Sequence, residues 1–300
     1  MKIQHLIYRA LFLTWLLQIG HGTLIAQTKL QVLTKKIEKT IPIDGQEVLR
    51  VEGDKSSIFI DTWAKNEVQV VLKLISKAPD KGIAEKELTF QRYIMEKRKG
   101  VIHLKNYLVV PHGTEKLGSI QISEYHIMVP KGCKLEIINQ YGDVKVSNVF
   151  GVVDIDVKYG KIDLKNINAA VSLKSYFGDL IARNFDGQLS GTTNHTKINL
   201  DDVSGEVQLS ATLGDVFIGS IGDLRSFKIE ASKADITLEN PDFERFNFNL
   251  DLQYGEILVP SIYKEHFKKL KNDSRTFVYN GPSNAATISL STSFGNIVAK

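Results

Sequence analysis

The sequence is poor in cysteine, and this shortage already limits the kinds of protein it can encode. Cys133 is the only cysteine among 300 residues, so the chain cannot form an internal disulfide bond. Small secreted scaffolds that depend on several disulfides are therefore excluded. Cys133 follows the turn Pro130–Gly132, and we expect its side chain to be a small buried hydrophobic group rather than a reactive thiol.

The sequence also lacks an excess of charge and the short motifs that mark common enzymes. The formal net charge is +4, and Lys2 and Arg9 are the charged residues of the first 26. The remainder carries 36 basic and 34 acidic side chains, a balance that argues against a nucleic-acid partner. No Gly-x-Ser-x-Gly elbow, phosphate-binding loop or dinucleotide fingerprint occurs. We therefore predict no cofactor and no nucleic-acid partner.

Metal ligands are sparse as well. Five histidines follow residue 26, and no two of them stand at the spacing of a metal site. They are His103, His112, His126, His195 and His266. The sequence contains neither an EF-hand loop nor a Gly-Gly-x-Gly-x-Asp run, so it predicts no calcium site either.

Long apolar runs are absent except at the start of the chain. Lys2 and Arg9 precede an apolar segment over residues 10–19, and small residues follow it. This order is typical of an export signal, and we predict that residues 1–26 are a signal peptide cleaved after Ala26. The alternative is an uncleaved anchor, for which the apolar run is short. An exported chain without disulfides is typical of the bacterial envelope, in the periplasm, on the outer surface or secreted.

What the sequence has in abundance is a repeat of about 18 residues. Five copies start 18 residues apart, and three looser copies follow at wider spacing. The copies start at Tyr141, Tyr159, Phe177, His195, Leu213, Lys233, Tyr254 and Phe294. Each copy contains two runs of alternating apolar and polar residues, which predicts two strands with one buried and one exposed face. We therefore predict an all-β fold, a single-stranded parallel β-solenoid with coils of 18–21 residues and of either handedness.

Stacking of the copies aligns columns of equivalent residues. The first column contains the eight starts and is mainly aromatic, and we expect His195 to stack between Phe177 and Leu213. The second column is mainly glycine, which predicts a backbone bend that a side chain would strain. Its glycines are Gly142, Gly160, Gly178, Gly214, Gly255 and Gly295.

Two further columns are polar. The third column alternates in sign over its first five members, so we expect ion pairs between neighbouring coils. These members are Asp143, Lys161, Asp179, Lys197 and Asp215. The fourth column holds short polar side chains, which we expect to form hydrogen bonds with the turn backbone. It contains Asn148, Asn166, Asn184, Asp202, Ser220 and Asn240.

Two parts of the chain depart from the repeat. Residues 27–132 are β-rich but irregular and contain no polar linker, so we expect them to lead into the repeat solenoid over 133–300. Within this section Asp80 is placed to cap the N-terminus of a short helix. Residues 261–272 carry apolar side chains at helical spacing, which predicts a short amphipathic helix inserted between coils. The apolar face of that helix would consist of Ile262, His266, Phe267 and Leu270.

Three stretches resemble the exported bacterial β-solenoid family known as "putative adhesin" or toastrack-like proteins, whose function is unknown. They are residues 58–70, residues 125–135 with Val-Pro-Lys-Gly, and the Gly-Asp-Val series of the repeat. The resemblance implies an envelope or surface location and a non-enzymatic binding or scaffolding role. It brings no catalytic residues. The chain departs from the family pattern at His195-Thr196 and in the insert after Val259.

Carboxylates supply the one enzymatic alternative. Asp154 and Asp156 share the predicted outer face of one strand, and glycosidases need two carboxyl groups about 5–9.5 Å apart. The short coils provide no long loops to wall a sugar cleft. We therefore predict a non-enzymatic protein that binds an envelope protein or a glycan. A carbohydrate-active hydrolase or lyase and an envelope stress-sensing component are the alternatives.

Overall fold

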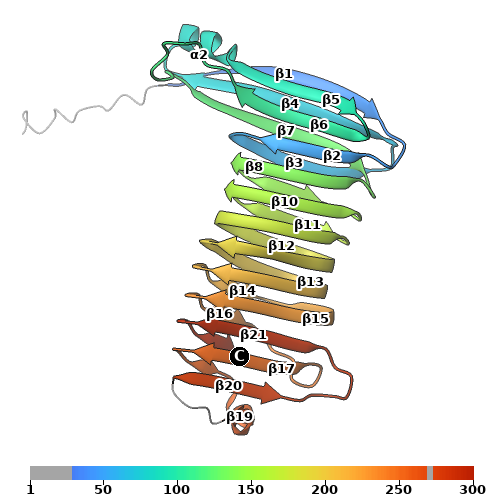
Figure 1. Ribbon diagram of the computed structural model, residues 1–300, viewed down its shortest axis with the longest axis vertical. Helices are drawn as coiled ribbons and strands as arrows, with labels where there is room; N and C mark the ends of the chain where they lie inside the picture. Colours follow the sequence, from blue (N-terminus) through green and yellow to red (C-terminus); the bar gives the residue numbers. More distant parts are fainter. Residues whose placement is uncertain (1–28, 269–272) are drawn as a thin grey trace, which may run out of the picture.

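The computed structural model describes residues 29–268 and 273–300, and the predicted signal peptide lies outside these residues. The described chain forms a long, narrow stack of β-coils, with helix α2 (Lys81–Leu88) near one end and strand β19 (Phe267–Lys268) near the other (Figure 1). Its strands belong to one continuous hydrogen-bonded sheet. The predicted all-β fold with parallel, stacked coils is confirmed.

Each regular coil contributes one segment to each of two faces, which enclose the core between them. The strands of these coils are β2 (Val48–Gly53), β3 (Ser56–Trp63), β8 (Lys134–Tyr141), β9 (Val144–Ser147), β10 (Val152–Tyr159), β11 (Ile162–Ile167), β12 (Ala170–Asn194), β13 (Thr196–Thr212), β14 (Val216–Ile218), β15 (Ile221–Ser232), β16 (Ile236–Leu238), β17 (Asn247–Gln253), β18 (Ile257–Leu258), β21 (Thr287–Ser293) and β22 (Ile297–Ala299). On the first face β2, β8, β10 and the start of β12 pair in parallel. On the second face β3, β9, β11 and the middle of β12 do the same.

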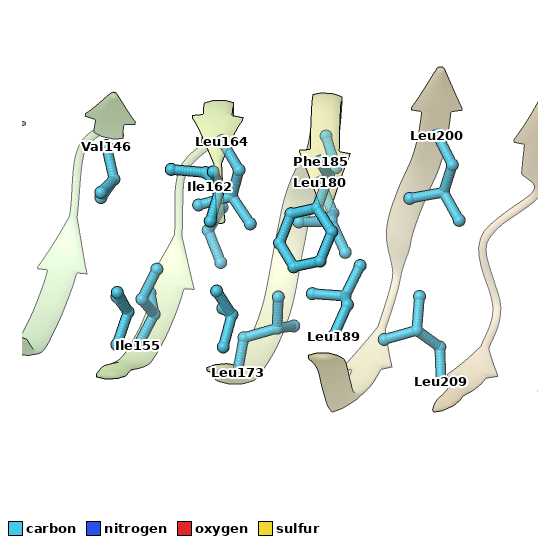
Figure 2. Close-up of a cluster of buried hydrophobic side chains, with 14 of the residues drawn as sticks. Val146, Ile155, Ile162, Leu164, Leu173, Leu180, Phe185, Leu189, Leu200 and Leu209 are labelled. Atoms are coloured by element: carbon cyan, nitrogen blue, oxygen red, sulfur yellow. The ribbon is translucent and has the colours of Figure 1, made fainter. Parts of the chain in front are cut away.

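Alternation along each strand decides which side chains enter the core. In β10, Val153, Ile155 and Val157 are buried, whereas Asp154 and Asp156 lie on the outer side and are partly exposed. Figure 2 shows two rows of apolar side chains that meet between the faces. One row includes Ile155, Leu173, Leu189 and Leu209, and the other includes Val146, Leu164, Leu180 and Leu200. Each such buried side chain contributes about 1.5–3 kcal/mol, so the core is the main source of stability.

The last coil in the sequence is not the last coil in the stack. Strand β21 pairs in parallel with β15 on one side and with β17 on the other. Strand β22 lies in the same way between β16 and β18. The chain therefore leaves a gap after β16, forms the outer coil β17–β18, and returns to fill the gap. The return passes through β20 (Ser274–Tyr279), which is antiparallel to β17 and also pairs with β19.

At the N-terminal end, too, the order of the coils in the stack differs from their order in the sequence. Strands β6 (Val101–Leu108) and β7 (Ile120–Pro130) pair in parallel with β2 and β3, and so form a coil outside the one that precedes them in the sequence. Antiparallel strands then end both faces: β5 (Gln91–Arg98) beside β6, and β4 (Glu67–Ala78) followed by β1 (Gln31–Pro42) beside β7. These strands cover the edges that a parallel stack would leave unpaired.

Helix α2 begins where the sequence predicts. The carboxylate of Asp80 accepts a hydrogen bond from the backbone N–H of Ile83 at 2.9 Å, as an N-cap residue does. Helix α2 contacts β1 and β4 at the N-terminal end of the stack. Across the two described ranges, no helix is long and apolar enough to cross a membrane.

The helical insert predicted within 261–272 is confirmed near its start, where Ser261–His266 form η1, a 3-10 helix that continues directly into β19. Its predicted apolar face is only partly correct: Phe267 packs against the core, Ile262 does not, and Leu270 lies outside the described residues. Ile262 is 74% exposed, whereas the ring of Tyr263 stacks on Phe243 at a centroid distance of 4.0 Å. An aromatic cluster that closes the end of the core holds Tyr263, and the pairing of β19 with β20 prevents the helix from continuing.

Candidate functional site

The tight corners between the two faces stack into two edges that run along the solenoid. We call the first the aromatic edge; in spatial order it contains Tyr141, Tyr159, Phe177, His195, Leu213, Lys233, Phe294 and Tyr254. We call the second the asparagine edge; it contains Asn148, Asn166, Asn184, Asp202, Ser220 and Asn240. Both are built by one residue from each successive coil.

Four rings of the aromatic edge form a continuous stack. The ring centroids are 5.0 Å apart between Tyr141 and Tyr159, 5.1 Å between Tyr159 and Phe177, and 4.8 Å between Phe177 and His195. Neighbouring ring planes differ by 22° or less. The exposed fractions are 45% for Tyr141, 45% for Tyr159 and 42% for Phe177. The edge therefore presents a row of aromatic groups to solvent.

A second pair of rings follows farther along the same edge. Phe294 stacks on Tyr254 at 4.7 Å, because the last coil of the sequence lies next to the coil of β17. Leu213, which is 40% exposed, and Lys233 separate this pair from the four-ring stack. The edge thus remains largely apolar and exposed over eight coils.

The second-column glycines position the rings by allowing neighbouring coils to approach closely. Gly178 has a φ of +142°, and a Cβ there would lie 2.1 Å from the carbonyl oxygen of Gly160. In the coil of Leu213, the first-column residue itself adopts the left-handed conformation, with a φ of 57°. The next residue, Gly214, is still close to the neighbouring coil, because a Cβ there would lie 2.1 Å from the carbonyl oxygen of Thr196. The same close approach to the neighbouring coil occurs at Gly142, Gly160, Gly255 and Gly295.

The predicted ion pairs of the third column are wrong. No salt bridge among the described residues joins Asp143, Lys161 or Asp179 to a neighbour in this column. Instead, a carboxylate oxygen of Asp143 accepts a hydrogen bond from the backbone N–H of Lys161 at 2.9 Å, and Asp215 accepts one from Asp235 at 3.1 Å. A fixed backbone donor stands within reach of Asp143 and of Asp215, whereas an exposed lysine would lose side-chain entropy for little gain.

The asparagine edge uses its polar groups within the chain. Asn148, Asn166 and Asn184 have φ values of 60°, 54° and 49°, a left-handed conformation that asparagine tolerates well. The amide of Asn166 donates to the side-chain oxygen of Asn148 at 2.9 Å, and that of Asn184 donates to Asn166 at 3.0 Å. Asn148 in turn donates to Asp61 at 2.7 Å. At these three positions the predicted bonds to the turn backbone are replaced by bonds between side chains, which leave few of their polar groups for a partner.

The carboxylates of the enzymatic alternative lie on the first face, on the outer side of β10. In the strand register Asp154 is level with Glu136, and Asp156 is level with Lys174. Glu136 already pairs with Arg50, whose Nε donates to Oε2 at 2.8 Å. These residues border a surface depression of about 290 Å³, which is below the range of about 300–1,000 Å³ typical of small-ligand sites.

A cavity that is broadly open to solvent, and that the sequence did not predict, lies at the N-terminal end of the aromatic edge. It has a volume of about 550 Å³, and residues that line it include Lys55, Ser57, Leu117, Ile120 and Tyr141. Lys55 and Tyr141 are far apart in the sequence and meet because β2 and β8 are neighbours in the sheet. One feature of the sequence could have indicated this neighbourhood: residues 56–58, Ser-Ser-Ile, are equivalent to residues 142–144, Gly-Asp-Val. The irregular spacing of the N-terminal section obscured this equivalence.

Buried hydrogen bonds hold the wall of this cavity. The hydroxyl of Ser56 donates to Asn106 at 2.9 Å and lies 2.6 Å from the hydroxyl of Ser123. The carboxylate of Glu87 accepts from the backbone N–H groups of Gly118 and Ser119 at 2.9 and 2.8 Å. Burial of Glu87 raises its pKa, but the hydrogen bonds from the Ser119 hydroxyl and these two N–H groups outweigh it, and the pKa lies below its ordinary value.

Other chemistry has little support in the described structure. Across residues 29–268 and 273–300, no three His, Cys, Asp or Glu side chains are grouped so that they could hold a metal ion. Cys133 is buried, and burial raises the pKa of its thiol to about 11. A thiol of this kind is a poor nucleophile.

Comparisons with known proteins place the chain in a family. No curated protein matches it. Similar solved structures include a "putative lipid binding protein" from Parabacteroides distasonis, with 11% identity and a TM-score of 0.46 over 90% of this chain and 97% of that one. A "putative adhesin" from Bacteroides fragilis has 11% identity and a TM-score of 0.39, over 89% of this chain and 97% of that one. A "putative adhesin" from Parabacteroides merdae has 13% identity and a TM-score of 0.34, over 89% of this chain and 96% of that one. The Toastrack DUF4097 model matches residues 86–299, which confirms the toastrack-like resemblance and covers more than two thirds of the chain. The chain belongs to the Toastrack DUF4097 family.

Proposed function

We propose that this chain is an exported, non-enzymatic binding or scaffolding module of the bacterial cell envelope. The observation that carries the proposal is the aromatic edge, where Tyr141, Tyr159 and Phe177 stack in a row and remain 42–45% exposed. Contiguous exposed aromatic surface on a folded protein marks an interaction site. The asparagine edge, built from the same coils, instead uses its side chains in hydrogen bonds within the chain.

The rigidity of the solenoid favours binding along this edge. The backbone pairing of successive coils fixes the rings before a partner arrives, so association requires little ordering of the protein. A row of similar groups at a constant spacing suits a partner that is itself repetitive. Envelope glycans and the exposed strands of envelope proteins both have that property.

The proposed location rests on the predicted signal peptide. We expect the chain made with residues 1–26 to be recovered from the periplasm, the outer surface or the medium. A version that lacks these residues should remain in the cytoplasm. Fractionation of cells that make each version tests the location, and recovery of both versions in the cytoplasm would contradict it.

Co-sedimentation of the purified mature chain with isolated bacterial envelopes tests the binding role. We expect the wild-type chain to bind, and the double variant Tyr159→Ala, Phe177→Ala to lose most of that binding. Asn184→Gly serves as the matched control, because it changes the other edge at a position whose positive φ glycine adopts without strain. Equal binding by all three proteins would overturn the proposal. So would turnover of a polysaccharide that disappears in Asp154→Asn, because the chain would then be an enzyme.

A further inference from the structure

The aromatic stack ends at Tyr141, and one face of this ring has no aromatic partner. Gly53 pairs with Asn139 and Ile58 pairs with Val144, so that Lys55 occupies the position level with Tyr141 in the preceding coil. Lys55 carries no ring, and within the described chain no aromatic or cation–π contact joins Tyr141 to a residue other than Tyr159. The next place in the ladder is therefore open.

The cavity described above lies at this open place. The coil of β6 and β7 does not close with a tight corner there, because residues 109–119 form a longer loop. The resulting space of about 550 Å³ includes Tyr141 and Gly142 in its lining. Its volume is within the range of about 300–1,000 Å³ that is typical of small-ligand sites.

The wall of the cavity is held in place before a ligand arrives. Ser56 and Ser123, which both line it, are buried and hydrogen-bonded to each other. Gln121 donates to Ser76 at 2.9 Å, and Glu87 fixes the loop at Ser119. A preorganised wall lowers the entropy cost of binding.

The chemistry of the lining selects the ligand. Leu117 and Ile120 supply apolar surface, and Ile120 is 57% exposed. Ser57 contributes a hydroxyl that forms no hydrogen bond within the described residues. Lys55 is the one charged side chain in the lining, and it forms no salt bridge with a described residue. A ring with an apolar face, hydroxyl groups and a negative charge is complementary to this combination.

We propose that this cavity binds an acidic sugar residue of a polysaccharide, with the apolar C–H face of the pyranose on Tyr141 and the carboxylate beside Lys55. The sugar takes the place of the missing ring in the aromatic ladder. The proposal rests on the proposed binding function and specifies its ligand class. The rest of the polysaccharide then runs along the exposed aromatic edge.

Titration of the mature chain with α-1,4-linked trigalacturonate, followed by calorimetry, tests the assignment. Galactotriose, its neutral counterpart, should bind at least about tenfold more weakly, since a charged hydrogen bond is lost. Tyr141→Ala should weaken trigalacturonate binding at least about tenfold. Lys55→Gln should remove the preference for the acidic sugar, and added salt should reduce that preference in the wild-type chain.

Tyr93→Ala is the matched control, because Tyr93 is a tyrosine of β5 with an exposed fraction of 38% that lies outside both edges and outside the cavity lining. It should leave trigalacturonate binding unchanged. Absence of binding, equal binding of the two trisaccharides, or equal effects of Tyr141→Ala and Tyr93→Ala would overturn the proposal. If envelope co-sedimentation still depends on Tyr159 and Phe177 in that case, the proposed function stands and the acidic-sugar site alone is wrong.

Discussion

The two edges of the solenoid use the same kind of corner for different purposes. Each edge contains residues with positive φ, such as Asn166 and Leu213, and each repeats with the coil. On the asparagine edge the side chains of Asn148, Asn166 and Asn184 form hydrogen bonds with one another. On the aromatic edge the rings stack but keep much of their surface in solvent. The comparison indicates that one edge mainly stabilises the coil while the other is available to a partner.

The largest effect should come from the core that both edges share. Ile162 is fully buried between Val144 and Leu180 of the neighbouring coils. Ile162→Asp would bury an unpaired charge and should cost several kcal/mol of unfolding free energy. Thermal unfolding measures the loss. Lys161→Asp, the adjacent control on the outer side, should cost less than about 1 kcal/mol, and equal losses would mean that the inner and outer faces are assigned wrongly.

The asparagine edge should give the next largest loss. Asn166→Ala removes one hydrogen bond to Asn148 and one from Asn184, and it places alanine at a φ of 54°. We expect a loss of about 2–3 kcal/mol in urea unfolding. Asn166→Gly keeps the backbone conformation accessible and should recover part of this loss. If both variants are as stable as the wild-type chain, the ladder does not stabilise the coil.

The aromatic edge should contribute less to stability. Tyr159→Ala removes stacking contacts at 5.0 and 5.1 Å from a side chain that is 45% exposed. We expect a loss of about 1 kcal/mol in the same urea experiment. Tyr159→Phe retains the ring and should be close to wild type. A loss larger than that of Asn166→Ala would reverse the comparison between the edges.

Acid should produce a smaller effect at the N-terminal end, outside both edges. The pKa of Glu47 is lowered to about 2, mainly by the hydrogen bond that its carboxylate accepts from Lys97. Burial of the carboxylate raises the pKa, whereas the hydrogen bond from the backbone N–H of Asp44 lowers it further. Because the folded pKa lies below the ordinary value of 4.5, ionised Glu47 stabilises the fold above pH 4.5, and this contribution is lost as the pH falls toward 2. Lys97 is 33% exposed, so solvent screening reduces the effect.

Melting temperatures of the wild-type chain and of Glu47→Gln between pH 7 and pH 2 test this contribution. The wild-type value should fall more steeply than that of the variant below pH 4.5. Parallel curves would show that Glu47 has no such role.

The sequence was sufficient to predict the repeated part of the fold but not the order of its ends. Coils 18 residues apart, from Tyr141 to Leu213, align by counting, and the Gly142 and Asn148 columns predict the two corners. Strand β21 lies between β15 and β17 because the chain leaves a gap and returns, and nothing local in the sequence records that order. The third-column ion pairs were mispredicted because backbone donors compete successfully for short acids such as Asp143.

The candidate cavity was missed for the same topological reason. Tyr141 was identified as a repeat position, but its neighbour Lys55 belongs to a coil whose spacing is irregular. The loop that leaves the place beyond Tyr141 open, residues 109–119, also belongs to an outer coil formed out of sequence order. The pairing of strands that are far apart in the sequence brings the residues of this cavity together. Such a site can therefore be recognised only in the structure.

The difference between the edges is tested most directly by measuring the affinity of single variants for isolated envelopes, with Tyr159→Ala and Asn166→Gly side by side. We expect Tyr159→Ala to weaken binding at least about tenfold, and Asn166→Gly, although less stable, to bind within about twofold of the wild-type chain. Loss of binding by Asn166→Gly with full binding by Tyr159→Ala would contradict this expectation.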